Sequence, residues 1–310
     1  MEPINVFEYE ILAKERMNPI YWDFYASGSD DEVTLRANQA DFARIRLRPR
    51  MLVDVAQCTT STSVLGLPVQ MPILVAPTSM HCLAHPEGEC ATALGAGRAG
   101  TLMIASSDAT RSLEEIAQVA NGPLYIYHSL DVAAWMVQRA EAAGYQAIVL
   151  TVDFPAMGNR ERSNRHAVPM PPPPLVEANF VGIEEEGQEW VPVTWETVDW
   201  LRSITTLPLL VKGILTAEDA RLSLEHGVSG IIVSNHGGRQ LDGVVTSIQA
   251  LPEIVEATAG RCEVYMDGGI RRGTDILKAL ALGARAVLVG RPVLWGLAVD
   301  GAGGVQQVLE

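Results

Sequence analysis

Short apolar segments recur eight times along the chain of 310 residues, and their spacing predicts the architecture. They cover residues 71–79, 101–106, 124–128, 147–153, 208–213, 230–235, 263–268 and 286–291. Within each segment the apolar residues are nearly continuous and do not alternate with polar ones. This pattern is typical of strands whose two faces are both covered, as in a parallel sheet.

Segments with helical periodicity lie between most of these strands. The clearest of them are residues 85–100, 129–145, 216–227 and 273–284. Thr216 is a suitable N-cap for the third segment, and Gly283 is a suitable C-cap for the fourth. Eight strands that alternate with helices favour a (β/α)8 TIM barrel, an α/β fold with a closed parallel sheet of eight strands. A doubly wound open sheet is the alternative.

Two regions lie outside this repeat, and we expect them to belong to one domain that spans residues 1–310. Residues 1–70 are predicted to form an N-terminal extension with helical and extended parts, and the barrel then occupies residues 71–310. Residues 154–198, which are rich in proline and charge, form a long loop after the fourth strand. Such a loop is typical of a mobile lid.

Polar residues or glycine stand where the apolar segments end. In chain order these are Thr78, Ser106, Tyr125 with Tyr127, Asp153, Lys212, Asn235 with His236, Asp267, and Gly290 with Arg291. The carboxyl ends of barrel strands form one face, and the active sites of such barrels lie there. We therefore expect these side chains to converge on a single site.

The excess of acidic side chains argues against polyanionic partners. The chain has 37 acidic and 23 basic side chains, which gives a formal charge of −14. Such an acidic surface is poorly suited to nucleic acid or anionic lipid, so we expect neither as a partner. The cysteines and histidines form no metal-binding pattern, and no metal site is predicted. No signal peptide, membrane span or targeting signal is recognisable, which predicts a cytoplasmic protein.

Two loops that contain glycine and arginine predict a phosphate site. Residues 267–273 read DGGIRRG after the seventh strand, and residues 289–292 read VGRP at the end of the eighth. In these barrels the loops after strands seven and eight commonly bind phosphate. Glycines let backbone N–H groups approach oxygens, and arginines add charged donors. The chain has neither GxGxxG after its first strand nor GxxxxGK[ST], which argues against a Rossmann or P-loop nucleotide site.

The sequence SNHGGRQLDG at the end of the sixth strand places a base beside a cation. His236 is a candidate general base, because the pKa of imidazole lies near neutral pH. Asp153, at the end of the fourth strand, is a candidate partner for the protonated imidazole. Arg239 and Arg160 are candidates for binding a carboxylate through paired hydrogen bonds.

Several motifs together resemble those of the FMN-dependent 2-hydroxy-acid oxidases and dehydrogenases, the family of glycolate oxidase and the cyanobacterial-type L-lactate oxidases. They are SNHGGRQLDG, LTVD, LVKGI, DGGIRRGTD and VGRP, and the likeness extends from INVFEYE to VQQVLE. The resemblance implies a barrel that binds FMN and oxidises a small (S)-2-hydroxy acid, such as glycolate or L-lactate, to the 2-keto acid. O2 then accepts the electrons and becomes H2O2. A homo-oligomer, either tetramer or octamer, is implied as well.

The resemblance also implies roles for individual residues. His236 matches the family's base, Asp153 matches its partner, and Tyr125 matches a tyrosine that contacts the substrate's oxygens. Arg239 and Arg160 match ligands of the substrate carboxylate. The matches to cofactor-binding positions are Pro77, Thr78, Ser106, Thr151, Lys212, Ser234, Asp267, Gly268, Gly269, Arg271, Gly290 and Arg291.

Lys212 admits more than one interpretation from its apolar context alone. It is a Schiff-base nucleophile, as in an aldolase, a cation beside a bound anion, or a side chain that reaches solvent at the strand end. The resemblance favours the second interpretation, because it implies a catalytic lysine near N1 and O2 of the flavin. A fixed cation at that position stabilises the negative charge of the reduced ring.

Three residues depart from the family pattern. Phe24 replaces a tyrosine whose hydroxyl binds the substrate carboxylate, a loss of about 1–3 kcal/mol if nothing compensates. Asp108 replaces an apolar residue, and at ~7 Å it would repel an anionic substrate by roughly 2 kcal/mol. Pro123 replaces a glutamine that reaches the pyrimidine edge of the flavin. The loop at 154–198 is also shorter than in relatives, and we expect the final helix to be truncated.

These departures keep open a flavin-binding homologue with impaired or altered catalysis. A dehydrogenase that uses an acceptor other than O2 is a further alternative, because access of O2 to the flavin depends on small cavities that the sequence does not reveal.

Overall fold

The computed structural model describes residues 3–119, 124–126, 130–168, 171–182 and 193–310. Its α-helices are α1 (Val6–Arg16), α2 (Pro19–Ala26), α3 (Val33–Ala40), α4 (Gly88–Arg98), α5 (Leu113–Val119), α6 (Leu130–Ala143), α7 (Glu161–Asn164), α8 (Trp195–Ile204), α9 (Ala217–Glu225), α10 (Ser247–Thr258), α11 (Gly273–Ala281) and α12 (Arg291–Leu309). Short 3-10 helices are η1 (Asp41–Arg44), η2 (His81–Leu83) and η3 (Ala178–Phe180). The strands are β1 (Thr62–Val64), β2 (Leu67–Val69), β3 (Ile73–Val75), β4 (Ala105–Ser106), β5 (Leu124–Ile126), β6 (Ile148–Thr151), β7 (Leu209–Ile214), β8 (Gly230–Val233), β9 (Glu263–Asp267) and β10 (Ala286–Val289).

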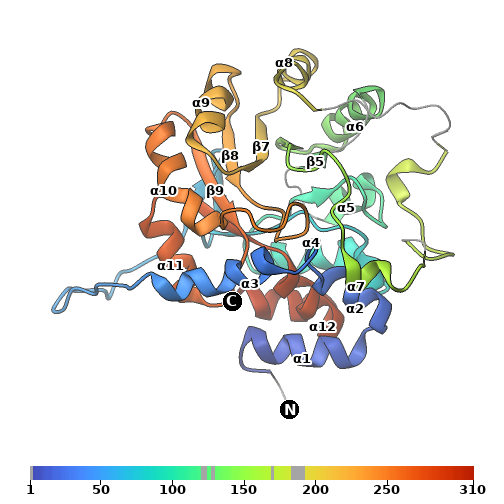
Figure 1. Cartoon of the computed structure of the whole chain (residues 1–310), viewed down its shortest axis with the longest axis horizontal. Helices are drawn as coiled ribbons and strands as arrows, with labels where there is room; N and C mark the ends of the chain where they lie inside the picture. The colour runs from blue at the N-terminus through green and yellow to red at the C-terminus, as the bar shows by residue number, and fades with distance from the viewer. Residues whose placement is uncertain (1–2, 120–123, 127–129, 169–170, 183–192) are drawn as a thin grey trace.

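Strands β3 to β10 form the predicted parallel sheet of eight strands, in the order β3-β10-β9-β8-β7-β6-β5-β4 (Figure 1). The two ends of this order also meet, because Val75 pairs with Met103 just before β4. Val75 N donates to Leu102 O at 2.9 Å, and Ile104 N donates to Val75 O at 3.0 Å. The sheet therefore closes, and the (β/α)8 barrel is confirmed over the open doubly wound sheet.

The helices cover the outside of the barrel (Figure 1), and α12 follows the last strand. Residues 291–309 are helical apart from a kink at Asp300 and Gly301, and the expected truncation of the final helix relative to the family that the sequence resembles stays a prediction. The two parts of α12 fold close to each other, since a Cβ on Gly296 would lie 2.4 Å from Gly304 O.

Two layers of apolar side chains explain why the strand segments are almost continuously apolar. Of two successive residues on a strand, one points into the barrel, and these inward side chains form a single apolar cluster. Its members on the barrel strands include Leu74, Ile104, Val149, Leu210, Ile232, Tyr265 and Leu288. Their neighbours on the strands face the helices, as Ile148, Val211 and Val287 do. Val64 and Val69 of the β1–β2 hairpin belong to the inner cluster, so the N-terminal extension covers one end of the barrel.

The alternation of side chains along each strand then determines which residues lie at the carboxyl end of the barrel. Side chains two residues apart on a strand share a face. The position two residues after each inner apolar residue therefore also points into the barrel, at its carboxyl end. Those positions are Ala76, Ser106, Thr151, Lys212, Ser234, Asp267 and Gly290. Most are polar, and together they form the floor of the predicted site.

The loop that follows β8 is hydrogen-bonded to the N-terminal extension. Asn38 and Asn235, both buried, exchange two hydrogen bonds between their side-chain amides at 2.9 and 2.8 Å. Asn235 Oδ1 also accepts from Gly238 N at 3.1 Å. The extension thereby orients the loop that carries His236.

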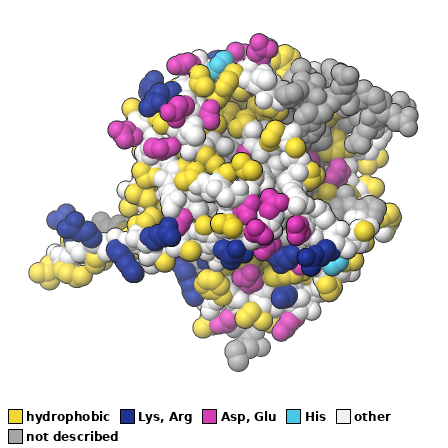
Figure 2. Space-filling model, viewed as in Figure 1, with side chains coloured by type: hydrophobic (Ala, Val, Ile, Leu, Met, Phe, Trp, Pro, Cys, Tyr) yellow, Lys and Arg dark blue, Asp and Glu magenta, His cyan; other side chains and the backbone are white. Residues whose placement is uncertain are grey.

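An extended arm, residues 45–61, leaves the body of the molecule between η1 and β1 (Figure 1). Its outer part exposes Met51, Leu52, Val53 and Val55, beside basic side chains (Figure 2). None of the described helices is long and apolar enough to cross a membrane.

The predicted long loop between β6 and β7 contains α7, η3 and the start of α8. Residues 169–170 and 183–192 of the loop lie outside the described part of the chain. Within the described part, Ala178 N donates to Ala109 O at 2.9 Å, so this portion of the loop is attached to the segment after β4.

Replacing Asn38 with Ala tests the connection between the extension and the barrel. We expect Asn38→Ala to lower the free energy of unfolding by about 1–3 kcal/mol, because it removes two hydrogen bonds of the buried Asn235 amide. Urea unfolding measures the change. The exposed neighbour Gln39→Ala is the matched control, and a loss no larger than in that control would contradict the expectation.

Candidate active site

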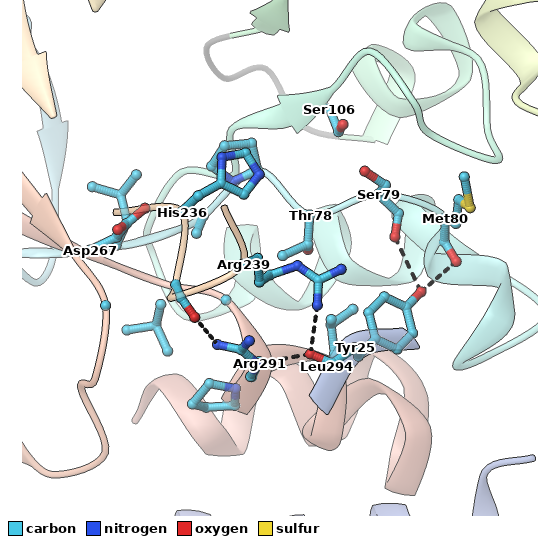
Figure 3. A pocket seen from close by; sticks show the side chains of 18 of the residues that line it. Tyr25, Thr78, Ser79, Met80, Ser106, His236, Arg239, Asp267, Arg291 and Leu294 are labelled. Atoms are coloured by element: carbon cyan, nitrogen blue, oxygen red, sulfur yellow. Dashed lines mark hydrogen bonds between the residues drawn. The ribbon is translucent and has the colours of Figure 1, made fainter. Parts of the chain in front are cut away.

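A cavity opens at the carboxyl ends of the barrel strands (Figure 3). It encloses about 280 Å³, close to the lower end of the range for ligand pockets, roughly 300–1,000 Å³. The predicted site residues that line it are Phe24, Pro77, Thr78, Ser106, Arg160, Lys212, His236, Arg239, Asp267, Gly268, Gly269, Arg271, Gly290 and Arg291. The sequence thus indicated half of the 28 described residues that line the cavity.

The imidazole of His236 is fixed from three sides. Its Nδ1 lies 3.0 Å from Asp153 Oδ1, and its backbone N donates to Ser234 Oγ at 3.0 Å. The ring of Phe154 packs at 5.6 Å between centroids. The backbone of His236 has φ of +56°, an uncommon conformation that its neighbours must maintain. A histidine held this way presents its other nitrogen to the cavity.

The surroundings of the pair favour a neutral base with an ionised partner. Burial lowers the pKa of His236 below its ordinary value of 6.5, although Asp153 acts in the opposite direction. Burial acts to raise the pKa of Asp153, but Lys212 and His236 together hold it below its ordinary value. At neutral pH the imidazole is free to accept a proton, and the carboxylate stabilises the imidazolium that results.

Glycine at position 213 makes room for this carboxylate. Gly213 follows Lys212 at an irregularity in β7 and has φ of +117°. A Cβ there would lie 2.5 Å from Asp153 Cβ. Lys212 itself is 3% exposed, and its Nζ lies 3.6 Å from Asp267 Oδ2. The buried ammonium group of Lys212 therefore lies on the floor of the cavity, beside Asp267 and close enough to Asp153 to interact with its charge.

The guanidinium groups of Arg239 and Arg160 form one cationic wall of the cavity. Arg239 donates to the carbonyl oxygens of Phe24 and Ser27 at 2.8 and 3.1 Å, and Arg160 Nε donates to Arg239 O at 3.3 Å. Burial lowers the pKa of Arg239 well below its usual value, and Arg160 and Arg291 act in the same direction. A bound anion would offset both effects, so this wall is suited to a carboxylate.

The loops after β9 and β10 form the second cationic region. Arg291 donates to the carbonyl oxygens of Tyr25, Gly237 and Ser27 at 2.8, 3.0 and 3.1 Å. Burial lowers its pKa to about 9, and Arg271 acts in the same direction. Arg271 lies over the ring of Trp295 at 4.8 Å. Two buried arginines beside glycine loops correspond to the phosphate site predicted from DGGIRRG and VGRP.

Other predicted site residues lie behind or outside the cavity lining. Asp153 stands behind His236, while Thr151 and Ser234 belong to the inward layer at the strand ends but are fully buried and do not line the cavity. The backbone of Tyr125 lies in β5, beside Ser106 and Val149, but its side chain lies outside the described part of the structure. Pro123 also lies outside it.

The sequence did not indicate several lining residues. Tyr25 lines the cavity and donates to Met80 O at 2.6 Å, and Phe154 packs on His236. Phe154 directly follows Asp153, so its place beside a strand end was a usable signal. Glu177 also lines the cavity, yet it comes from the long loop, where no periodic pattern indicates position.

Comparison with known proteins identifies the group to which this site belongs. The family model described as FMN-dependent dehydrogenase matches residues 13–310. The chain belongs to the FMN-dependent dehydrogenase family. The L-lactate oxidase of Nostoc sp. is 51% identical, over 99% of this chain and 91% of that protein. The glycolate oxidase of Spinacia oleracea is 49% identical, over 100% of this chain and 89% of that protein.

Solved structures agree with this membership of the FMN-dependent dehydrogenase family. A mandelate oxidase in complex with (S)-2-phenylpropionate superposes with a TM-score of 0.94 at 44% identity, covering 99% of this chain and 90% of that one. The predicted family, the barrel and FMN as cofactor are therefore confirmed.

The cavity of this family member also fits FMN on its own evidence. Asp267 Oδ1, Arg271 Nε and Thr151 Oγ1 are buried polar atoms without a hydrogen-bond partner within the described residues. A Cβ on Gly269 would lie 1.9 Å from Asn38 O. Only glycine at this position therefore allows the loop after β9 to pack this closely against the N-terminal extension. Arg271 and Arg291 would hold the phosphate, and Lys212 would stand by the ring.

The aromatic ring of Phe24 supports an arginine in place of the expected hydroxyl. The guanidinium of Arg239 lies 5.5 Å from the ring centroid of Phe24. Phe24 thus contributes a surface for Arg239 and no hydrogen bond to a ligand. The side chain of Asp108 lines the same cavity and accepts from Ser107 Oγ at 2.9 Å.

Replacing Arg291 with Met tests the phosphate region. We expect Arg291→Met to weaken FMN binding by about 10- to 100-fold, because a charge-assisted contact is lost. Fluorescence titration of the apoprotein with FMN measures the dissociation constant, and thermal unfolding of both apoproteins shows whether the fold survives. Arg272→Met is the matched control, because the Arg272 guanidinium lies over the ring of Phe7, outside the cavity. Equal weakening in both variants would contradict the assignment.

Proposed function

We propose that the protein is an FMN-dependent oxidase of small (S)-2-hydroxy acids, of the glycolate or L-lactate type. The observation that carries the proposal is the arrangement around one cavity of a base paired with a carboxylate, a guanidinium cluster and a buried ammonium. The relatives at about half identity are L-lactate oxidase and glycolate oxidase, which supports this substrate class.

Each group has a chemical task in this reaction. Arg239 and Arg160 bind the substrate carboxylate and orient the α-carbon. His236 takes up a proton released from the substrate, and Asp153 stabilises the resulting charge. Lys212 stabilises negative charge on the cofactor side of the cavity.

Tyr125 contacts the substrate's oxygens in this scheme, and Phe24 supports the arginine wall. When bound, FMN supplies the two-electron acceptor, and O2 reoxidises it with formation of H2O2. The overall change converts the hydroxyl of the substrate into the carbonyl of a 2-keto acid.

Assembly as a tetramer or an octamer is part of the proposal. The apolar side chains exposed on the arm at residues 45–61 support it, because a large exposed apolar patch is typical of an interface. The cytoplasmic location stays a prediction from the sequence.

Anaerobic reduction of the holoenzyme tests the function. We expect glycolate or L-lactate to bleach the flavin absorbance, and we expect air to restore it with one H2O2 formed for each substrate oxidised. Persistent yellow colour with every 2-hydroxy acid would instead identify a flavin-binding protein without this catalysis. Bleaching that air does not reverse would identify a dehydrogenase that uses another acceptor.

The pKa of His236 predicts the pH dependence of flavin reduction. The neutral imidazole is the active form, and burial lowers its pKa below 6.5. The rate constant should therefore be constant at neutral pH and above, and fall as the pH drops below about 6.5. Stopped-flow reduction at a series of pH values measures the midpoint.

Two substitutions should move this midpoint in opposite directions. Asp153 raises the pKa of His236, so Asp153→Asn shifts the midpoint to lower pH and slows the plateau rate by about 100-fold. Lys212 lowers the pKa of His236, so Lys212→Met shifts the midpoint to higher pH. Shifts in the same direction would exclude His236 as the titrating base.

A further inference from the structure

The cavity has an acidic wall that the proposed reaction does not use. Asp108 and Glu177 line the same cavity as His236 and Arg239. Asp108 follows β4, whereas His236 and Arg239 follow β8. In the closed ring of eight strands β4 and β8 are four positions apart in either direction, so they face each other. Asp108 therefore follows the strand opposite the one that leads to His236 and Arg239.

The acidic wall is built from two segments that are firmly joined. Ala178 N donates to Ala109 O at 2.9 Å. Ala178 directly follows Glu177 and Ala109 directly follows Asp108, so this bond joins the segments that carry the two acids. Asn179, 1% exposed, accepts from Leu113 N and donates to Ser107 O, both at 2.9 Å. These bonds fix the loop segment that carries Glu177 to the segment that carries Asp108.

Apolar side chains also line the cavity that holds the acidic wall and Arg239. Met80, Phe154 and Met157 offer apolar surface to methylene groups. A 2-hydroxy acid whose carboxylate binds Arg239 could extend its side chain over this surface. The end of a sufficiently long side chain would then lie on the side of the cavity that Asp108 and Glu177 line.

We propose that the protein prefers 2-hydroxy acids whose side chain ends in a cation, such as an ammonium group. The proposal rests on the function proposed above and specifies its substrate class. A cation on the substrate side chain would be attracted by the carboxylates of Asp108 and Glu177, whereas a side chain that ends in an anion would be repelled. An ionised carboxylate can accept several hydrogen bonds, so Asp108 can bind an ammonium while it accepts from Ser107.

A matched pair of substrates tests the proposal on the holoenzyme. The pair is (S)-2-hydroxyhexanoate and (S)-6-amino-2-hydroxyhexanoate, which have the same carbon chain and differ in the terminal ammonium. Anaerobic stopped-flow reduction gives the ratio of rate constant to dissociation constant for each. We expect the ammonium acid to be favoured by about tenfold, as for an ion pair that is partly screened by solvent.

Substitutions of the acidic wall should remove this preference. Asp108→Asn and Glu177→Gln each lower the ratio between the two substrates several-fold, and the double variant brings it to about one or below. Glu87→Gln, which removes a charge from a side chain that is 72% exposed and outside the cavity lining, should keep the wild-type ratio. The flavin absorbance spectrum of each variant shows that the site is intact.

The outcomes separate this proposal from the function on which it rests. Reduction by glycolate or L-lactate without any preference for the ammonium acid overturns the substrate class and leaves the oxidase intact. A preference that survives in both single variants and in the double variant overturns the assignment to Asp108 and Glu177. Absence of reduction by every 2-hydroxy acid overturns both proposals together.

Discussion

The alternation of side chains along the closed sheet is the constraint on which the site depends. Inside the barrel one layer after another is apolar up to Val149, Leu210, Ile232, Tyr265 and Leu288. The next inward position on each strand then falls at the carboxyl end, where no further layer covers it. A polar residue such as Lys212 or Asp267 is mostly buried there and also lines the cavity, which is the environment that shifts pKa values and binds ligands.

The electrostatics of the site oppose those of the whole molecule. The chain carries a formal charge of −14, yet the floor and one wall of the cavity hold Lys212 and the arginines at positions 160, 239, 271 and 291. Burial of so many cations is costly unless anions accompany them. Asp153 and Asp267 supply part of that compensation from the protein, and a phosphate and a carboxylate are suited to supply the rest.

The sequence predicted the barrel and half of the described cavity lining for a definite reason. Apolar strands end abruptly, so the residues at their ends, such as Lys212 and His236, are placed by the fold itself. Glu177 was not indicated, because a long loop has no periodic pattern that reports position. Phe154 was not indicated either, although its place directly after Asp153 at a strand end was a usable signal.

The glycine after Lys212 has a consequence for how this barrel can diverge. With φ of +117° and the side chain of Asp153 directly against it, position 213 leaves no space for even a methyl group. Any larger residue would push the carboxylate away from the imidazole and the ammonium at once. The basicity of His236 and the electrostatic environment of Lys212 therefore both depend on glycine at position 213, which itself takes no part in the chemistry.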